Sequence, residues 1–269
     1  MKIGPGSDPR SAISAANADA IVVRGFDLCA DLIGAVSLTD HFFLLVTGRK
    51  PTDGQRRVLD ATLVAIAEHG LVPSVQASRM TYAAAPEALQ GAVAAGILGC
   101  GSVILGASEA AGLFLVDVLA EAGPDDSALD AAARSVVGRM RAAKRPIPGY
   151  GHPLHKRQDP RVGRLLRVAE EAGMAGRHIR AAIAVEGVLP ATIGKALAMN
   201  VSSAIPAVLL DAGFPVQALK GVPILARTAS LVAHLVEEQL RPIGFILSEH
   251  AGKAIAYDGP APAGFVPTT

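Results

Sequence analysis

Two side chains of this chain stand out for the chemistry they can do, Arg227 and His152. Arg227 lies in a mostly apolar run, Leu225-Ala226-Arg227-Thr228-Ala229. A charge in such surroundings needs a partner, and a ligand carboxylate suits it because the planar guanidinium pairs with a carboxylate through two hydrogen bonds. His152 stands at the end of a loop, and a histidine both accepts and donates a proton near neutral pH. These residue types suit a site that holds a carboxylate and transfers a proton.

The segment around His152 is the most conspicuous non-helical stretch, Arg145-Pro146-Ile147-Pro148-Gly149-Tyr150-Gly151-His152-Pro153. Its prolines and glycines predict an ordered loop or a hinge. Gly149 and Gly151 allow the backbone to approach a ligand closely, because neither carries a Cβ atom. The basic residues beside the loop are Lys144, Arg145 and Lys156. They either neutralise the phosphates of a ligand or are solvated surface charges.

Helical periodicity dominates the rest of the chain, and glycines and prolines mark the turns between apolar runs. The helices that we expect span residues 26–36, 38–46, 52–68, 86–98, 108–122, 129–143, 160–172, 178–189, 193–200, 203–212 and 224–239. No stretch has the alternating pattern of a strand. The segment after Pro242 is expected to be partly extended against a partner. The sequence therefore predicts an all-α fold.

Composition narrows the class of protein further. The chain has 269 residues, enough for one large or two modest domains. Its net charge is +1 and only 18% of its residues are charged, so no basic surface indicates binding to nucleic acid. Hydrophobic residues make up 51% and aromatic residues 4%, which suits closely packed helices. Because little polar surface remains for a monomer, we expect an oligomer that covers an apolar helical face.

Cysteine usage and the N-terminal residues predict a cytoplasmic location. Cys29 and Cys100 lack the CxxC spacing, and we expect buried free thiols in a reducing compartment. The first residues have no apolar core of the kind found in signal peptides. Residues 91–107 are nearly all apolar, but the run is shorter than the ~20 residues of a membrane span and contains several glycines. We therefore expect a buried helix hairpin there and no membrane contact.

Six segments, in the same order along the chain, resemble motifs of the citrate synthase family. They are Arg24-Gly25-Phe26-Asp27, Gly48-Arg49-Lys50-Pro51-Thr52, Glu68-His69-Gly70, Pro148-Gly149-Tyr150-Gly151-His152 with Asp159-Pro160-Arg161, Asn200-Val201, and the segment 226–239, which is similar to ARxxGxxAHxxEQ. The resemblance covers about residues 20–260. The chain is shorter than ordinary citrate synthases, so it looks nearer to the compact citryl-CoA lyase branch, as in the C-terminal module of ATP-citrate lyase.

The resemblance implies a fold, a reaction and partners. The fold would be a large helical domain, residues 1–111 and 213–269, with an inserted smaller helical domain, residues 112–212. Two copies would form a homodimer. The protein would make or cleave a carbon–carbon bond between an acetyl-CoA-type thioester and a keto acid such as oxaloacetate. Its ligands would be coenzyme A, as the acyl-CoA substrate, and a di- or tricarboxylate, with no metal ion.

The resemblance also implies roles for individual residues. His152 would be catalytic at the oxygen of the oxyacid, and His69, Arg161 and Arg227 would bind the substrate. The coenzyme A loop would consist of Pro148, Gly149, Tyr150 and Gly151, with Lys156 nearby. Three alternatives stay open: His152 as a structural residue that caps the loop, Arg161 in a surface ion pair, and His69 as a buried, hydrogen-bonded core residue.

The chain departs from the family pattern at two catalytic positions. Ile104 stands where citrate synthases have the histidine that donates to the thioester oxygen, and Ser202 stands where they have the aspartate base. A serine hydroxyl without assistance is too weak a base for a thioester methyl group. A family arginine donated across the dimer also has no clear match, with Lys253 as a possible substitute. The alternative function is therefore a degraded relative that binds acyl-CoA or a carboxylate without turnover.

Overall fold

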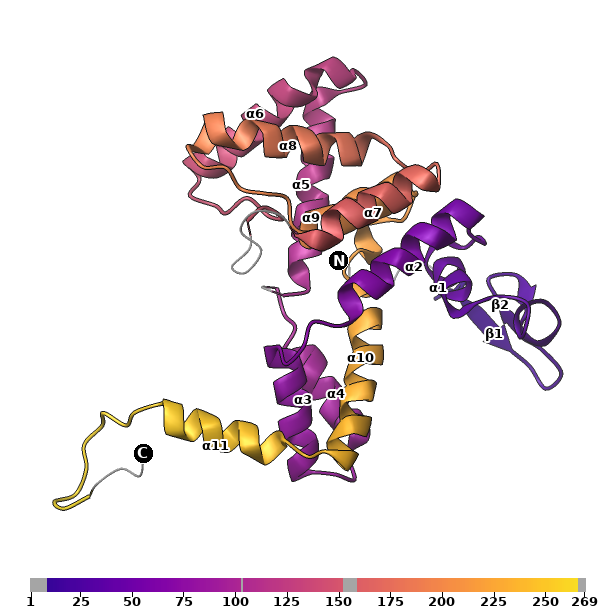
Figure 1. The fold of residues 1–269 in the computed structure, drawn as a ribbon. Coiled ribbons are helices and arrows are strands. Elements are labelled where there is room, and N and C mark those ends of the chain that lie inside the picture. Colours follow the sequence, from indigo (N-terminus) through magenta and orange to yellow (C-terminus); the bar gives the residue numbers. More distant parts are fainter. Residues whose placement is uncertain (1–8, 103, 152–158, 266–269) are drawn as a thin grey trace.

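The computed structural model describes residues 9–102, 104–151 and 159–265, and helices dominate it (Figure 1). The α-helices are α1 Leu38–Thr47, α2 Asp53–Ala67, α3 Pro73–Ala84, α4 Leu89–Leu98, α5 Gly106–Ala122, α6 Leu129–Ala142, α7 Pro160–Glu171, α8 Arg177–Ile193, α9 Val201–Asp211, α10 Gly221–Leu240 and α11 Gly244–Ala254. The predicted all-α class is confirmed. Most of the predicted helices lie within a few residues of these bounds, and α3 is a further helix that was not predicted.

Helices α5 to α9 pack together at one end of the molecule (Figure 1). There α5 contacts α6, α8 and α9, and the buried side chains of these helices form the main hydrophobic core. Helix α10 packs instead against α2, α3 and α4, while α2 also contacts α7. The proposed domain boundaries at residues 112 and 212 stay a prediction.

Helix α10 approaches its neighbours closely because of small residues. A Cβ atom on Gly96 of α4 would lie 2.7 Å from a methyl carbon of Leu231 on α10, so only glycine permits this spacing. At its far end, α10 is tied to α3 by a buried ion pair between Arg79 and Glu238, with Nε and Oε2 2.5 Å apart. Helix α10 is therefore a fixed support for any side chain on its buried face.

The prediction that the chain has no strand is wrong near the N-terminus. Three short strands, β1 Ser14–Ala16, β2 Ile21–Val23 and β3 Phe26–Asp27, form an antiparallel sheet. Val23 pairs with Phe26, and the intervening Arg24 and Gly25 have φ angles of 50° and 88°. Two consecutive residues with positive φ form the tight turn that matches the twist of a hairpin. A π-helical turn, Leu28–Leu32, then replaces the helix predicted for residues 26–36.

One predicted helix is absent and one further helix is present near the C-terminal end. Helix α8 ends at Gly194, whose φ is 73°, so the predicted helix 193–200 does not form. In the segment after Pro242, predicted to be partly extended, residues 255–265 are not helical, but the residues before them form α11, which was not predicted. Its first backbone N–H groups, on Ile243 and Gly244, donate to the Glu238 carboxylate at 2.9 Å and 2.7 Å. A carboxylate on these N–H groups stabilises the start of a helix.

The expectations of buried cysteines and of no membrane contact can be compared with the structure. Cys100 is buried as predicted, but Cys29 is exposed. Among the described residues, Val216–Leu240 is the one helical segment long and apolar enough to cross a membrane. It contains α10, which packs against α2, α3 and α4, as the core helix of a soluble protein does. Absence of membrane contact therefore stays a prediction.

Candidate active site

The predicted coenzyme A loop lies directly against the segment that leads into α9. The backbone N–H of Gly151 donates to the Ala198 carbonyl at 2.7 Å, and the Asn200 N–H donates to the Gly149 carbonyl at 2.9 Å. The Asn200 side-chain amide also donates to the Gly151 carbonyl at 2.5 Å. Two motifs that are about fifty residues apart in sequence thus form one structure, and the loop is held beside the first turn of α9.

Gly149 is the point of closest approach between this loop and α9. Its φ is 85°, and a Cβ atom added to it would lie 2.5 Å from the Ser203 Cβ atom. The position therefore requires glycine both for its conformation and for space. The motif glycine serves helix packing here, in addition to any contact with a ligand.

Tyr150 anchors the loop from within the core. Its side chain is buried, its hydroxyl donates to the Ala182 carbonyl at 2.8 Å, and it accepts from the Ser203 hydroxyl at 3.4 Å. Burial raises the pKa of the Tyr150 hydroxyl far above its usual value, and the hydrogen bond from Ser203 offsets only part of this. The phenol is therefore a structural group, and any ligand contact of Tyr150 would involve its backbone.

Ser202 occupies the first turn of α9, and its backbone N–H donates to the Asn200 side chain at 2.9 Å. Asn200 is the N-cap of the helix. Ser202 is therefore on a helix terminus whose peptide dipoles favour an anion, next to the loop. His152 and Lys156, which the resemblance places in the same region, lie outside the described residues.

Arg161 is engaged with a carboxylate of the chain itself. Its Nε and Nη2 atoms donate to the two carboxylate oxygens of Asp159 at 2.9 Å and 2.8 Å. Asp159 is buried, caps α7 and accepts the backbone N–H of Val201 at 3.0 Å. Burial acts to raise the pKa of Asp159, but the hydrogen bonds from Arg161 and Val201 outweigh it and lower the pKa to about 2. The alternative that Arg161 forms an ion pair is therefore correct, but its partner Asp159 is buried and not on the surface.

Arg227 differs sharply from Arg161. It is only 4% exposed, and its Nε and Nη1 atoms have no hydrogen-bond partner within the described parts of the chain. Burial lowers the pKa of the guanidinium, Cys100 and Glu68 act in the opposite direction, and the positive charge of Arg161 adds to the lowering. Buried donors without acceptors are rare and costly in native proteins. Their arrangement is suited to an anionic ligand.

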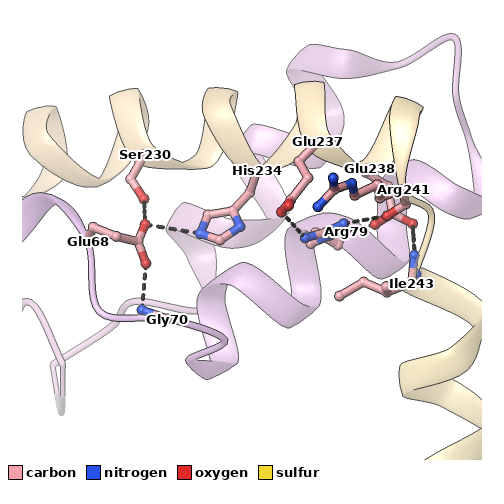
Figure 2. Close-up of polar contacts among 10 residues, drawn as sticks. Glu68, Gly70, Arg79, Ser230, His234, Glu237, Glu238, Arg241 and Ile243 are labelled. Carbon is pink, nitrogen blue, oxygen red and sulfur yellow. Dashed lines mark hydrogen bonds and ion pairs between the residues drawn. The ribbon is translucent and has the colours of Figure 1, made fainter.

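His69 is exposed, so the reading of it as a buried core residue does not hold. It belongs to a turn that the Glu68 side chain fastens to α10. One Glu68 oxygen accepts the backbone N–H of His69 at 2.8 Å and that of Gly70. The other oxygen accepts the Ser230 hydroxyl and lies 3.0 Å from Nε2 of His234 (Figure 2). Because Ser230 and His234 both belong to α10, this turn is held on the helix that carries Arg227.

A cleft of about 550 Å³ opens between α5 and α6, beside the loop. Its apolar wall includes Leu113, Phe114 and Met140, and two arginines, Arg139 and Arg145, also line it. Pro146 and Pro148 of the loop line it as well. Sequence reasoning indicated Arg145 and Pro148, but it missed Arg139 because only the packing of α6 brings that residue to the loop.

Other predicted positions are also placed by the structure. Ile104 is 44% exposed and precedes α5. Lys253 pairs with Glu249 one turn earlier on α11, at 2.6 Å. Within the described ranges, no group of three or more His, Cys, Asp or Glu side chains is placed to hold a metal ion. The prediction missed Ser230 as a partner of Glu68, although its spacing from Arg227 and His234 on one helix was visible.

The chain is thus an all-α protein with two groups of arginines, Arg161 with Arg227 and Arg139 with Arg145. Both groups are suited to small anionic ligands. The family model for the citrate synthase C-terminal domain matches residues 23–244, and the chain belongs to the citrate synthase family.

Solved structures of similar proteins include one of closely matching length. Citryl-CoA lyase from Hydrogenobacter thermophilus is 31% identical, with a TM-score of 0.83 over 96% of this chain and 97% of that one. ATP citrate lyase from Methanothrix soehngenii, in complex with citrate and coenzyme A, is 22% identical, with a TM-score of 0.74 over 96% of this chain and 43% of that one. At that identity the second likeness shows the fold alone.

Curated relatives are longer. Putative citrate synthase 2 of Mycobacterium tuberculosis is 29% identical over 221 residues, which is 79% of this chain and 54% of that protein. Citrate synthase of Heyndrickxia coagulans is 26% identical over 208 residues, 76% of this chain and 52% of that protein. The chain thus spans about half the length of the curated relatives it matches.

Proposed function

We propose that this protein cleaves citryl-CoA, or a close 3-hydroxy-3-carboxyacyl-CoA, into an acetyl-CoA-type thioester and a keto acid such as oxaloacetate. The observation that carries this proposal is the buried Arg227, whose Nε and Nη1 have no partner within the described residues. A carboxylate of the substrate supplies both missing acceptors. It also neutralises a charge that is expensive to bury.

Arg161 has a supporting role in this proposal. Its charge acts on Arg227, so the two guanidinium groups form one positive region. Because Arg161 is held in place by Asp159, it presents a fixed charge to a di- or tricarboxylate without reorganising. His69, on the exposed turn that Glu68 holds against α10, is the further substrate-binding residue in the proposal.

For coenzyme A, we propose the loop Pro148–Gly151 together with the adjoining cleft. Arg139 and Arg145 line this cleft and are suited to phosphate groups, while Leu113, Phe114 and Met140 offer apolar contacts. The likeness to citryl-CoA lyase, an enzyme named for a coenzyme A thioester, supports this assignment.

In the proposed mechanism, His152 accepts the proton of the citryl hydroxyl group. The electron pair of that O–H bond forms the keto group, and the adjacent carbon–carbon bond breaks. The departing fragment is the enolate of the thioester, which takes a proton from water or a nearby donor and becomes acetyl-CoA. This direction begins at the hydroxyl, so it tolerates Ser202 in place of an aspartate base better than synthesis does.

The second candidate is ligand binding without turnover. It is favoured by Ile104 and Ser202, which stand where relatives have proton-transferring side chains. Both functions predict binding of coenzyme A and a carboxylate, and only the first predicts products. We propose a homodimer in the cytoplasm for either function.

The deciding experiment is incubation of the full chain with citryl-CoA. We expect oxaloacetate, measured by coupled NADH oxidation, and acetyl-CoA, measured by mass spectrometry, in equal amounts. Arg227→Gln should abolish both, whereas Arg57→Gln, at an exposed pair with Glu171, should not change the rate. Calorimetric binding of citrate and coenzyme A without products would favour the second candidate. Absence of binding and of products would contradict both.

A further inference from the structure

A cluster of three side chains joins the His69 turn to α10, and the mechanism above assigns no role to it. Glu68 receives hydrogen bonds on both of its carboxylate oxygens, from the His69 and Gly70 backbone on one side and from Ser230 and His234 on the other (Figure 2). Hydrogen bonds from Ser230, Gly70 and His234 outweigh the effect of burial and lower the pKa of Glu68. The carboxylate is thus ionised at neutral pH and fully engaged.

The spacing on α10 places this cluster beside Arg227. Arg227, Ser230 and His234 are three and four positions apart, so they follow one face of the helix. Arg227 and Ser230 are buried, and His234 is partly buried. Glu68 also acts electrostatically on Arg227. One carboxylate therefore touches the turn of a predicted substrate-binding residue and influences the charge of the second.

His234 directs one ring nitrogen at Glu68 and the other into the protein. Its Nε2 faces Glu68, so the tautomer that carries hydrogen on Nε2 donates to the carboxylate. Its Nδ1 is buried and has no partner within the described residues.

We infer that Glu68, held by Ser230 and His234, is a positioning residue for oxyacid binding: it fixes the His69 turn at a set place along the face of α10 that carries Arg227. This inference rests on the proposed function. The cluster does not touch the reacting atoms, and it acts through His69 and Arg227. Gly70, with a φ of 72°, lets the backbone turn so that its N–H also reaches the Glu68 carboxylate.

The competing explanation is that Glu68 only stabilises the packing of the turn on α10. A control for this is Glu237, a glutamate on α10 itself that forms a charged hydrogen bond. Its Oε2 accepts from Arg79 at 2.8 Å, which joins α10 to α3 and leaves the His69 turn untouched. Glu237→Gln therefore removes a similar interaction from the same helix without affecting the proposed positioning.

The test compares Glu68→Gln, Ser230→Ala, His234→Ala and His234→Gln with Glu237→Gln. Citrate and coenzyme A are titrated separately by calorimetry, and thermal unfolding is recorded for each variant. We expect Glu68→Gln and His234→Ala to weaken citrate binding at least about tenfold, because each removes a hydrogen bond to a charged group. Coenzyme A binding should change less than twofold. His234→Gln, which retains an N–H donor, should restore much of the citrate affinity.

The outcomes separate the two claims. Glu237→Gln should lower the unfolding temperature without changing citrate affinity. The positioning role is wrong if Glu68→Gln lowers the unfolding temperature without changing citrate affinity, or if it weakens the binding of citrate and coenzyme A equally. The proposed function stands in either case. If the wild-type chain binds no citrate at all, the proposed function is wrong and the positioning role is lost with it.

Discussion

Asp159 and Arg161 form a bidentate ion pair at the start of α7, and the same Asp159 carboxylate accepts the backbone N–H of Val201 at the start of α9. The pair thus joins the first turns of two helices that carry predicted site residues. Arg161 is consequently a fixed charge, whereas Nε and Nη1 of Arg227 have no hydrogen-bond partner among the described residues. The two arginines should therefore respond differently to substitution and to added citrate.

The first prediction concerns the stability cost of Arg227. Arg227→Met should raise the free energy of unfolding by about 1–3 kcal/mol, because it removes buried donors that have no acceptor among the described residues. The same variant should lose stabilisation by citrate. Arg79→Met is the matched control: Arg79 is equally buried but bonded to Glu237, Glu238 and the Arg241 carbonyl. It should destabilise the protein by about 3–5 kcal/mol. Denaturant titration with and without citrate measures both, and a large loss in Arg227→Met would contradict the ligand assignment.

The second prediction is a dependence of stability on pH through Asp159. Its pKa of about 2 in the folded protein is below the ordinary value of 3.8, so folding is favoured by the ionised form. This stabilisation, about 2 kcal/mol, is fully present above pH 4 and is lost as the pH falls through 2. Asp159→Asn should therefore be less stable at pH 7, and its difference from the wild type should shrink below pH 4. A difference that is constant down to pH 2 would show that the ionised carboxylate is unimportant.

The third prediction tests the contact between the loop and α9. Gly149→Ala should destabilise the fold by about 2–4 kcal/mol, because the added Cβ atom meets Ser203 and the φ of 85° is unfavourable for alanine. Gly138→Ala in α6, where no atom lies within 4 Å of the added Cβ, should stabilise it by about 0.5–1 kcal/mol. Thermal unfolding of the two variants provides the comparison. Equal effects would mean that the loop can move away from α9.

The fourth prediction concerns the position of the missing base. Wild-type protein should show negligible condensation of acetyl-CoA with oxaloacetate, and Ser202→Asp should raise it measurably. An aspartate is favoured electrostatically in the first turn of α9, beside the loop, so the variant should fold. Rescue should be partial, because Ile104 still provides no donor for the enolate oxygen. The assay is exchange of the acetyl-CoA methyl protons in heavy water. Rapid exchange by the wild type would show that another residue, such as Glu109 or His155, already acts as the base.

The fifth prediction is a homodimer. Large apolar side chains are exposed along α10 and α11, namely Val232, Val236, Leu240, Phe245 and Ile246. Helix α11 and the residues after it also extend away from the rest of the molecule (Figure 1). Covering these faces would remove a large apolar area from water. Light scattering at micromolar concentration should give twice the chain mass, and Val236→Glu should shift the protein to monomer. A monomeric wild type would contradict the prediction.

The sequence by itself determined the helical class and the order of the family motifs. Helical periodicity is a local property, so α1, α2, α5, α6 and α7 could be predicted to within a few residues. The predicted site residues came from motifs that are local in the same sense.

The tertiary structure alone decided which charges are paired. Arg79, Arg161 and Arg227 all stand within or at the start of helices, yet Arg79 is bonded to α10 and Arg161 to its own N-cap residue, while Nε and Nη1 of Arg227 have no partner in the part of the chain that the structure describes. Helix α11 likewise depends on Glu238 accepting its first N–H groups. The Arg79 pair and the start of α11 depend on contacts that the local pattern does not contain, and Asp159 and Arg161, though two residues apart, are joined to Val201 only by the packing of α7 on α9. The strength of each charge pair also depends on burial that only the packed helices create.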